Sequence, residues 1–350
     1  MKQVLVRCTN WIGDAVMSLA ALRELRRLQP QARLTLLARE WVAPIFEGQG
    51  VADQVVTLEN RSLGVRGVFR VGRRLRGFDT AVLFQNAFEA ALLALTARIP
   101  NRIGYTTDGR RLLLTQGVRP RIKDLGRHQT YYYLDLLFQA GVSSIDYLED
   151  SSFRPDIHLT PSRAQLESAD SLLGEAGVES GRPLVGLNPG AAFGSAKRWF
   201  PERYAEVADR LIEEAGAEVV LLGSSSETPI AVRVREQMKQ TPRFLVGRTS
   251  LSALIGVLAR CRLFLGNDSG PMHLSAALGV PLVAVFGSTD EVATGPLSPQ
   301  ATVIHKHVEC SPCLLRECPI DLRCFDRIHS GEVYRAARRL LTRNQAPGRP

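Results

Sequence analysis

Two loops in the second half of the sequence combine small residues with groups that can bind phosphate. The first spans residues 188–200 (NPGAAFGSAKRWF) and carries one lysine, Lys197, near its end. The second begins at Gly266 (GNDSGPMHLSAALG) and runs into a helix that we expect to start near Pro271. Free backbone N–H groups and the dipole at a helix start favour an anion. We therefore expect a diphosphate to be held between Lys197 and this helix start without a metal ion.

Side chains of the second loop fit the same role. Ser269 can donate a hydrogen bond from its hydroxyl group, and Gly270 lets a ligand approach the backbone. The alternative is that Asp268 and Ser269 only cap the helix, as short polar residues often do. The sequence leaves both interpretations open.

A carboxylate near the N-terminus is a second candidate for chemistry. In the string TNWIGDAVMSLAAL, Asp14 follows Gly13 where the first strand is expected to turn into the first helix. A carboxylate in that place can be an electrostatic cap of the helix. It also lies at the carboxyl end of a strand, where it could act as general base on an acceptor hydroxyl.

The phosphate-binding motifs of two large enzyme classes are missing. No string fits the P-loop pattern G-x4-G-K-[ST], and no G-x-G-x-x-G follows the first strand or the apolar run that ends at residue 187. The first absence argues against a P-loop NTPase. The second argues against a standard NAD enzyme.

The chain is strongly basic, and the excess charge is uneven. Its formal net charge is +9 and its isoelectric point is about 9.6. Residues 61–77 hold six arginines and no acid, and residues 109–128 hold five arginines and a lysine. A nucleic-acid partner is not expected, because neither interleaved aromatic residues nor a known motif is present. We interpret the first stretch as a contact zone for phosphates, with a solvated basic face as the alternative; its residues include Arg70, Arg73, Arg74 and Arg76.

Four of the six cysteines form a cluster near the C-terminus. Their spacing is C-x2-C-x4-C-x5-C, and they are Cys310, Cys313, Cys318 and Cys324. In a cytosolic protein such a cluster indicates a structural metal, an iron–sulfur centre or a redox function rather than a disulfide framework. The alternative is a set of reduced structural thiols. Cys8 and Cys261 are expected to be ordinary core residues.

Strand-like and helix-like segments alternate in both halves of the chain. Short apolar runs such as KQVLVRC and AEVVLLG are typical of strands buried on both faces of a parallel sheet. Amphipathic segments lie between them, and in one of these Pro201 suits the first helical turn and Gly216 the C-terminal stop. The alternation predicts an α/β fold with two Rossmann-like, doubly wound domains facing across a cleft.

The same pattern suggests how the chain is divided. We expect residues 1–160 and 161–330 to form the two domains, and residues 331–350 to form a helix and tail that pack back on the first. No apolar stretch approaches the roughly 18 residues needed to span a bilayer. Polar residues, among them Arg7 and Asn10, interrupt the N-terminal apolar run, so we expect no signal peptide and a cytoplasmic protein.

Three strings carry a resemblance to a known family. NWIGDAVMSLAALRELR, NPGAAFGSAKRWFPERYAEVADRL and NDSGPMHLSAALGVPLVAVFGSTD are similar to segments of the ADP-heptose:lipopolysaccharide heptosyltransferases of glycosyltransferase family nine, above all its heptosyltransferase II group. The resemblance covers nearly the whole chain. It implies the GT-B fold of two Rossmann-like domains and an inverting transfer of heptose from ADP-L-glycero-D-manno-heptose.

The resemblance also implies roles for single residues. Asp14 matches the catalytic base, and Lys197 matches the lysine that neutralises the nucleotide diphosphate. Glu227 lies near the place where the family uses a carboxylate for the nucleoside. The donor-binding set is Asn188, Gly190, Lys197, Glu227, Asp268, Ser269, Gly270 and His273. The first domain would hold the acceptor and the second the nucleotide sugar, and no cofactor is expected.

The implied acceptor is the heptosyl-Kdo-lipid A inner core of lipopolysaccharide. An enzyme acting on it would work peripherally at the cytoplasmic face of the inner membrane, in contact with an anionic surface. One alternative is a family-nine transferase with another heptose or sugar acceptor, of heptosyltransferase I or III type. The other is a non-catalytic sugar-nucleotide or metal-cluster binding protein, against which Asp14 argues because a binder needs no general base.

Overall fold

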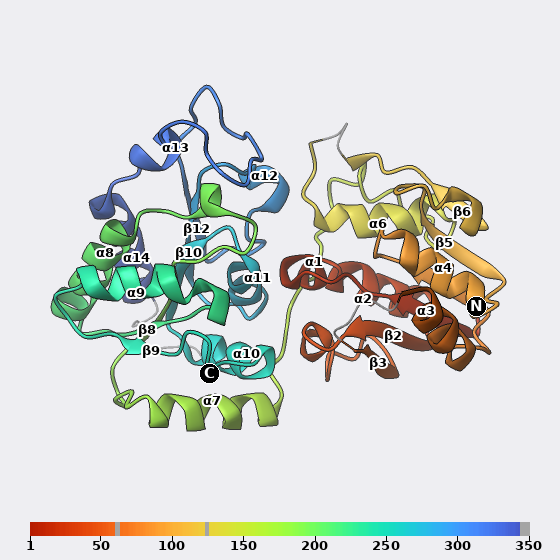
Figure 1. Cartoon of the computed structure of the whole chain (residues 1–350), viewed down its shortest axis with the longest axis horizontal. Helices are drawn as coiled ribbons and strands as arrows, with labels where there is room; N and C mark the ends of the chain where they lie inside the picture. Colours follow the sequence, from red (N-terminus) through yellow and green to blue (C-terminus); the bar gives the residue numbers. More distant parts are fainter. Residues whose placement is uncertain (60–63, 123–125, 344–350) are drawn as a thin grey trace. The chain divides into compact units, whose positions relative to one another are not determined.

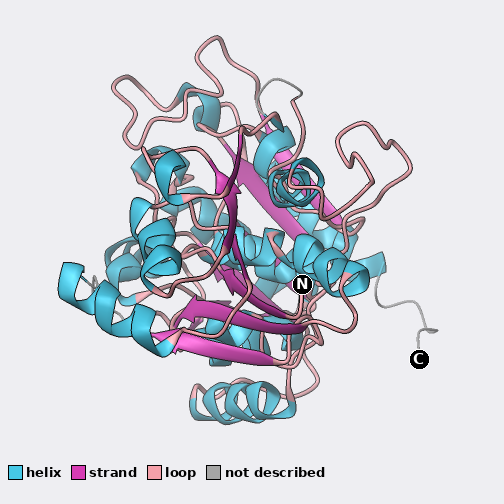
Figure 2. Cartoon of the chain, turned by 90° about the vertical axis from the view of Figure 1, so that its right-hand side faces the viewer, coloured by secondary structure: helices cyan, strands magenta, loops and turns pink. Residues whose placement is uncertain are grey.

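The computed structural model describes residues 1–59, 64–122 and 126–343 and contains two compact units, Met1–Ile157 and His158–Pro350 (Figure 1). Each unit has one six-stranded sheet. Figure 2 shows strands as the inner layer, with helices around them. Helices that cover both faces of a sheet require apolar side chains on both sides of its strands, which explains the nearly continuous apolar runs.

In the first unit the strands follow the order β3-β2-β1-β4-β5-β6, and all neighbours are parallel. The strands are β1 (Gln3–Arg7), β2 (Arg33–Arg39), β3 (Gln54–Leu58), β4 (Thr80–Leu83), β5 (Asn101–Tyr105) and β6 (Gln116–Val118). The described helices are α1 (Ile12–Met17), α2 (Leu19–Leu28), α3 (Gly64–Arg74), α4 (Phe88–Thr96) and α6 (Thr130–Gln139), with short 3-10 turns η1 (Ala43–Ile45) and η2 (Arg111–Leu113).

In the second unit the order is β12-β11-β10-β7-β8-β9, again all parallel. The strands are β7 (Leu184–Asn188), β8 (Glu218–Leu221), β9 (Arg243–Phe244), β10 (Leu263–Asn267), β11 (Leu282–Phe286) and β12 (Ala301–His305). The helices are α7 (Arg163–Glu175), α8 (Pro201–Ala215), α9 (Thr228–Gln237), α10 (Leu251–Arg260), α11 (Gly270–Ala277), α12 (Glu291–Thr294), α13 (Arg323–Asp326) and α14 (Ser330–Arg343), with 3-10 turns η3 (Ser195–Lys197) and η4 (Ser225–Glu227).

Both sheets are wound in the same way. Successive strands step outward from β1 to β3, the chain then returns to place β4 beside β1, and β7 to β10 repeat this pattern. Strand order therefore reverses between β1 and β4 and between β7 and β10. Ligands of open α/β sheets bind outside the carboxyl ends of the strands at such a reversal. The prediction of two doubly wound, Rossmann-like domains is confirmed.

Helix α8 fixes the chain that leaves the first predicted loop. Pro201 occupies its first turn, and Gly216 ends it with a left-handed φ of +62°, so both sequence signals are confirmed. Tyr204 of this helix packs edge-on against Trp199, with ring centroids 4.9 Å apart, and both side chains are fully buried. The loop end at Trp199 is thus anchored in the core of the second unit.

Helix α14 corrects the expected place of the C-terminal segment. We expected residues 331–350 to pack on the N-terminal domain, but α14 packs against α8, β10 and β11 of the second unit. Val333 and Leu341 enter the core there, and the Tyr334 hydroxyl donates to Glu214 Oε2 at 2.7 Å. The apolar face of this helix therefore completes the second sheet's cover; residues 344–350 lie outside the described chain.

Candidate active site

The carboxyl ends of β7 and β10 lie side by side and carry the two predicted loops. Asn188 is the last residue of β7 and Asn267 the last of β10, and Asn188 pairs with Gly266 across the sheet. Both asparagines are fully buried. The loops that begin at these two residues are therefore neighbours at the strand-order reversal of the second sheet.

Asn267 joins the two loops, and the sequence analysis missed it. Its Nδ2 donates to Pro189 O at 2.9 Å and to Gly190 O at 3.3 Å, and its Oδ1 accepts from Trp199 N at 3.1 Å and from the Tyr204 hydroxyl at 2.8 Å. One side chain thus fixes both ends of the first loop. The sequence did hold a signal for Asn267, because it is a polar residue at the end of an otherwise apolar strand and directly precedes Asp268.

Lys197 and Asp268 meet, as the sequence analysis predicted that the loops would. Lys197 Nζ lies 2.6 Å from Asp268 Oδ2, and the two side chains are only 15% and 6% exposed. Asp268 Oδ2 also accepts from Thr294 Oγ1 at 3.2 Å, and His273 Nε2 lies 4.0 Å from Asp268 Oδ1. The carboxylate therefore holds the lysine in one place at the start of α11.

The alternative that Asp268 and Ser269 only cap α11 is wrong. Ser269 occupies the N-cap position but its side chain makes no capping hydrogen bond. The Asp268 carboxylate binds Lys197 and Thr294 instead of backbone N–H groups. The backbone donors at the start of α11 therefore have no side-chain cap from these two residues.

Glu227 lies against the glycine of the first loop. A side chain at Gly190 would overlap the Glu227 carboxylate in its observed position. Glu227 Oε2 accepts from Ser224 N at 2.7 Å and from Ser224 Oγ at 2.8 Å, which fixes the carboxylate in the turn after β8. The structure thus brings Asn188, Gly190 and Glu227 to the same sheet edge as the Lys197–Asp268 pair.

Four buried polar atoms at this edge have no hydrogen-bond partner within the described chain. They follow three neighbouring strands, β7, β10 and β11, and are Asn188 Oδ1, Ser269 Oγ, Ser288 Oγ and Thr289 Oγ1. Buried polar groups in folded proteins are nearly always paired. A polar ligand or bound water could pair with Asn188, Ser269 and Thr289, which adds Thr289 to the predicted residues, whereas Ser288 also lines the cavity of the clustered cysteines.

In the first unit, Asp14 lies in the first turn of α1 and has a hydrogen-bond donor that the sequence analysis missed. The Tyr133 hydroxyl of α6 donates to Asp14 Oδ1 at 2.9 Å. Burial raises the Tyr133 pKa well above its ordinary value, and the nearby Asp14 charge adds to this rise. Tyr133 therefore stays protonated and holds one carboxylate oxygen of Asp14 in a fixed direction.

Cationic and aromatic side chains surround the strand ends near Asp14. Arg7 ends β1 and donates to Asn10 Oδ1 at 2.9 Å, and Arg39 ends β2 and pairs with Glu89 at 3.1 Å. Burial lowers the Arg7 pKa to about 10, which still leaves it charged at neutral pH. Trp11, which directly precedes α1, is 63% exposed. None of these residues had a predicted role in the site.

The two basic stretches differ in their structure. Val68 of α3 and Leu75 of the following turn are buried, whereas the proposed contact residues of the same stretch are exposed; they are Arg70, Arg73, Arg74 and Arg76. In the second stretch, Arg110 is fully buried and donates to Tyr105 O at 2.8 Å, and Arg121 pairs with Asp135 at 2.5 Å. The second stretch is therefore partly internal and does not form one basic face. Arg61 lies outside the described residues.

The cysteines fall into two groups. Cys8 and Cys261 are buried, and burial raises the pKa of each thiol to about 12, so the prediction of inert core residues is confirmed. The other four are free thiols that line one cavity of the second unit.

Comparisons with known proteins agree on one family. The sequence matches the family described as glycosyltransferase family 9 (heptosyltransferase) over residues 68–323. It is 33% identical over 311 residues to lipopolysaccharide heptosyltransferase 2 of Salmonella typhimurium, covering 86% of this chain and 87% of that protein. It is 30% identical to lipooligosaccharide heptosyltransferase 2 of Haemophilus influenzae, covering 86% of this chain and 88% of that protein.

A solved structure matches both units together. The fold superposes on that of E. coli ADP-heptose lps heptosyltransferase II with a TM-score of 0.85 at 28% sequence identity, covering 99% of this chain and 100% of that chain. The family match includes Lys197, Glu227 and Asp268 but begins after Asp14.

Proposed function

Because the chain belongs to glycosyltransferase family 9, the heptosyltransferases, we propose that it moves heptose from ADP-heptose to the heptosyl-Kdo-lipid A inner core in lipopolysaccharide biosynthesis. Its relatives named heptosyltransferase 2 support this acceptor over those of other family members. The observation that carries the proposal is the Lys197–Asp268 pair at the strand-order reversal of the second sheet, where Asn188 Oδ1, Ser269 Oγ and Thr289 Oγ1 are buried without a partner in the described chain.

The second unit binds the donor in this proposal. The diphosphate accepts hydrogen bonds from the backbone at the start of α11 and from Ser269, while Lys197 contributes the positive charge. Asp268 orients Lys197 through the 2.6 Å ion pair, and His273 lies beside that carboxylate. Negative charge grows on the diphosphate as the sugar leaves, so preorganised donors there stabilise the transition state more than the ground state.

Glu227 and the first loop bind the nucleoside part of the donor. Carboxylates accept hydrogen bonds from sugar hydroxyls, and the Ser224 contacts hold the Glu227 carboxylate in one orientation. Gly190 leaves the room that a close approach to this carboxylate requires. The ADP named for the E. coli relative supports an adenine nucleotide.

Asp14 acts as the general base. It removes the proton from the acceptor hydroxyl while that oxygen attacks the anomeric carbon of heptose, the carbon–oxygen bond to the diphosphate breaks, and ADP leaves. Attack from the face opposite ADP inverts the anomeric configuration. Tyr133 holds the Asp14 carboxylate in place through its 2.9 Å hydrogen bond.

The experiment that tests the function uses acceptors of defined length. The purified enzyme is incubated with ADP-heptose and one of three acceptors, Kdo-lipid A that carries no heptose, one heptose or two heptoses. The masses of the products are measured by mass spectrometry. We expect one heptose to be added to the acceptor that already bears one. Transfer only to the acceptor without heptose, or only to that with two, would assign a different family acceptor. If the protein binds ADP-heptose but transfers heptose to none of the three acceptors, it is a non-catalytic binding protein.

A further inference from the structure

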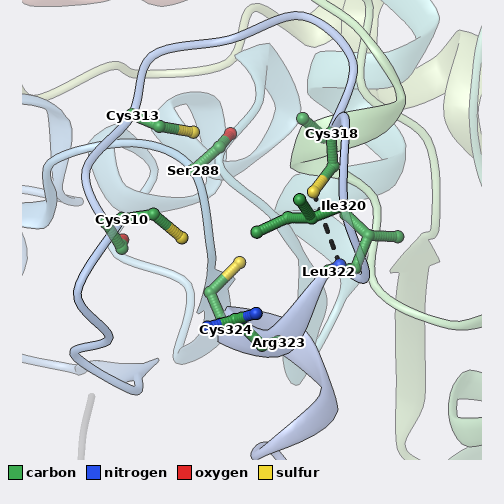
Figure 3. A pocket seen from close by; sticks show the side chains of 10 residues that line it. Ser288, Cys310, Cys313, Cys318, Ile320, Leu322, Arg323 and Cys324 are labelled. Atoms are coloured by element: carbon green, nitrogen blue, oxygen red, sulfur yellow. Dashed lines mark hydrogen bonds between the residues drawn. The ribbon is translucent and has the colours of Figure 1, made fainter.

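All four clustered cysteines line one small cavity in the second unit. Its walls also include Ala196, Ser288 and Arg323, and its volume is about 20 Å³. Figure 3 shows the four sulfur atoms turned toward the space between them. All four thiols are free. The sequence cluster is thus also a cluster in space.

The segment that carries these cysteines contains no helix or strand from residue 306 to residue 322. Loops of this length without structure of their own are uncommon in compact domains and are usually functional. Leu314 and Leu322 have left-handed φ values of +57° and +54°, which are unfavourable for a branched side chain. Such backbone persists only where the surroundings fix it. Leu314 directly follows Cys313, and Leu322 lies between Cys318 and Cys324, so the fixed backbone lies at the cysteines.

The chemistry of the four sulfur ligands indicates which metal could bind in this cavity. Four thiolates with no carboxylate among the cavity walls suit a soft or borderline ion such as zinc, and do not suit magnesium or calcium. The cavity among the four sulfur atoms has room for one ion. Leu322 N donates to Cys318 Sγ at 3.4 Å, a contact that stabilises negative charge on sulfur.

We propose that Cys310, Cys313, Cys318 and Cys324 bind a single zinc ion in a tetrahedral tetrathiolate site. Binding replaces the four S–H protons, which are released to solvent, and leaves a zinc tetrathiolate of net charge −2. Arg323 lines the cavity and lies next to this charge. Neither oxidant nor reductant is involved, because zinc keeps its oxidation state.

The loop must close slightly around the ion. Among described residues, the group of three whose ligand atoms all lie within 4.8 Å of one another is Glu291, His305 and His307, and not the cysteines. Zinc–sulfur bonds of about 2.3 Å would draw the four sulfur atoms nearer together.

The zinc ion would act on the donor site through the loop, without contacting the substrate. Arg316 O, between Cys313 and Cys318, accepts from Ala196 N at 3.0 Å, directly beside Lys197. A side chain at Gly194 would overlap the Arg316 backbone, and Leu314 N donates to Ser288 O at 2.8 Å. The cysteine loop thus supports the turn that carries Lys197. We infer that zinc fixes this support.

Metal content of the native protein is the first test. Protein purified from zinc-supplemented cultures is analysed by plasma mass spectrometry, and its zinc is exchanged for cobalt. We expect about one zinc per chain and intense cobalt–thiolate absorption in the near ultraviolet, with visible bands typical of tetrahedral coordination. Hydrogen exchange in residues 306–322 should rise when a chelator removes the ion. These readouts need no variant and no activity.

Two variants and two controls locate the ion. Cys313→Ser/Cys318→Ser should lose at least about tenfold in bound zinc. Cys8→Ala removes a thiol outside the cluster, and His307→Gln disrupts the neighbouring Glu291–His305–His307 group; both should keep the ion. Retained zinc in the double variant, or loss in His307→Gln alone, would overturn the proposal. So would metal-free native protein after zinc addition, or iron accompanied by acid-labile sulfide, which indicates a polynuclear cluster.

Discussion

Lys197 and Asp268 form a nearly buried ion pair, so a substitution of either residue affects stability as well as ligand binding. Removing one partner of such a pair leaves the other charge buried and uncompensated, which destabilises the protein independently of any ligand. Thr294, which also contacts Asp268, is neutral and cannot replace the lysine charge. A single substitution at Lys197 therefore mixes two effects, folding and diphosphate binding.

A double substitution separates these effects. Lys197→Met should lower the free energy of unfolding by about 3 kcal/mol, the low end for a broken buried pair, because the lysine is 15% exposed. Lys197→Met/Asp268→Asn should recover most of that stability. It should still bind ADP about 10- to 100-fold more weakly than the native protein, which is the loss of affinity expected when one charged hydrogen bond is removed. Urea denaturation and calorimetry with ADP measure the two quantities. Wild-type ADP affinity in the double variant would remove Lys197 from the donor site.

Asp14 is predicted to act in the chemical step and not in donor binding. Asp14→Asn should reduce kcat by at least about 100-fold, the usual scale for a general base, with ADP affinity unchanged. Tyr133→Phe should leave the carboxylate in place but less well oriented, so its loss in kcat should be smaller. Initial rates and ADP calorimetry give both numbers. If Asp14→Asn turns over as fast as the native enzyme, the residue only stabilises the start of α1.

At the scale of elements, Asn267 connects two strands, a loop and a helix. Its amide makes four hydrogen bonds, to Pro189, Gly190, Trp199 and Tyr204. Three of these partners belong to the first loop, and Tyr204 belongs to α8, the helix that follows it. The position of Lys197 therefore depends on a residue that contacts neither Lys197 nor, in our proposal, the donor.

Replacing Asn267 should loosen the first loop. Asn267→Ala leaves several buried partners unsatisfied, so the free energy of unfolding should fall by about 3 kcal/mol and ADP affinity should fall with it. Tyr204→Phe removes only one of the four bonds and should cost about 1 kcal/mol with ADP affinity unchanged. Urea denaturation and calorimetry compare the two variants. Equal ADP affinity in all three proteins would mean that the loop keeps its position without Asn267.

The sequence predicted the elements well where their burial leaves a local pattern. Strands buried on both faces give continuous apolar runs, and Pro201 and Gly216 marked the ends of α8. The sheet against which α14 packs was predicted wrongly, because an apolar helix face can pack on many sheets and its sequence pattern does not specify which one. Arg110 and Arg70 also look alike in the sequence, although one is internal and the other exposed.

The candidate site was predicted only in part for a related reason. Loops that follow parallel strands meet at one sheet edge, so Lys197 and Asp268 could be placed together from the strand pattern. The Tyr133–Asp14 and Asn267–Trp199 contacts join residues 119 and 68 positions apart in the chain. No local spacing encodes such contacts, and they appear only when the fold is known.

At the scale of the whole molecule, the basic charge has to be related to the proposed lipid acceptor. Described residues include no helix long and apolar enough to cross a bilayer. Val68 of α3 and Leu75 of the following turn are buried, whereas the arginines of this stretch are exposed and Phe69 is 51% accessible. A basic helix face with an exposed aromatic side chain suits the surface of an anionic membrane. We infer that α3 and the following turn dock the first unit on that surface.

A charge-matched pair of variants tests this docking. Each basic residue near an anionic bilayer contributes about 1 kcal/mol, reduced by salt, so removing four should weaken binding to phosphatidylglycerol-containing vesicles by at least about tenfold. The test variant carries Gln at Arg70, Arg73, Arg74 and Arg76. The control carries Gln at four exposed arginines of α14 in the second unit, Arg335, Arg338, Arg339 and Arg343.

Vesicle sedimentation should show weaker membrane binding in the first variant alone. Steady-state kinetics should show a raised KM for the lipid acceptor in that variant alone, with kcat and donor KM little changed. Added salt should reproduce the effect in the native enzyme. Equal losses in both variants would mean that only net charge matters, and unchanged binding in the first would show that α3 is not the docking surface.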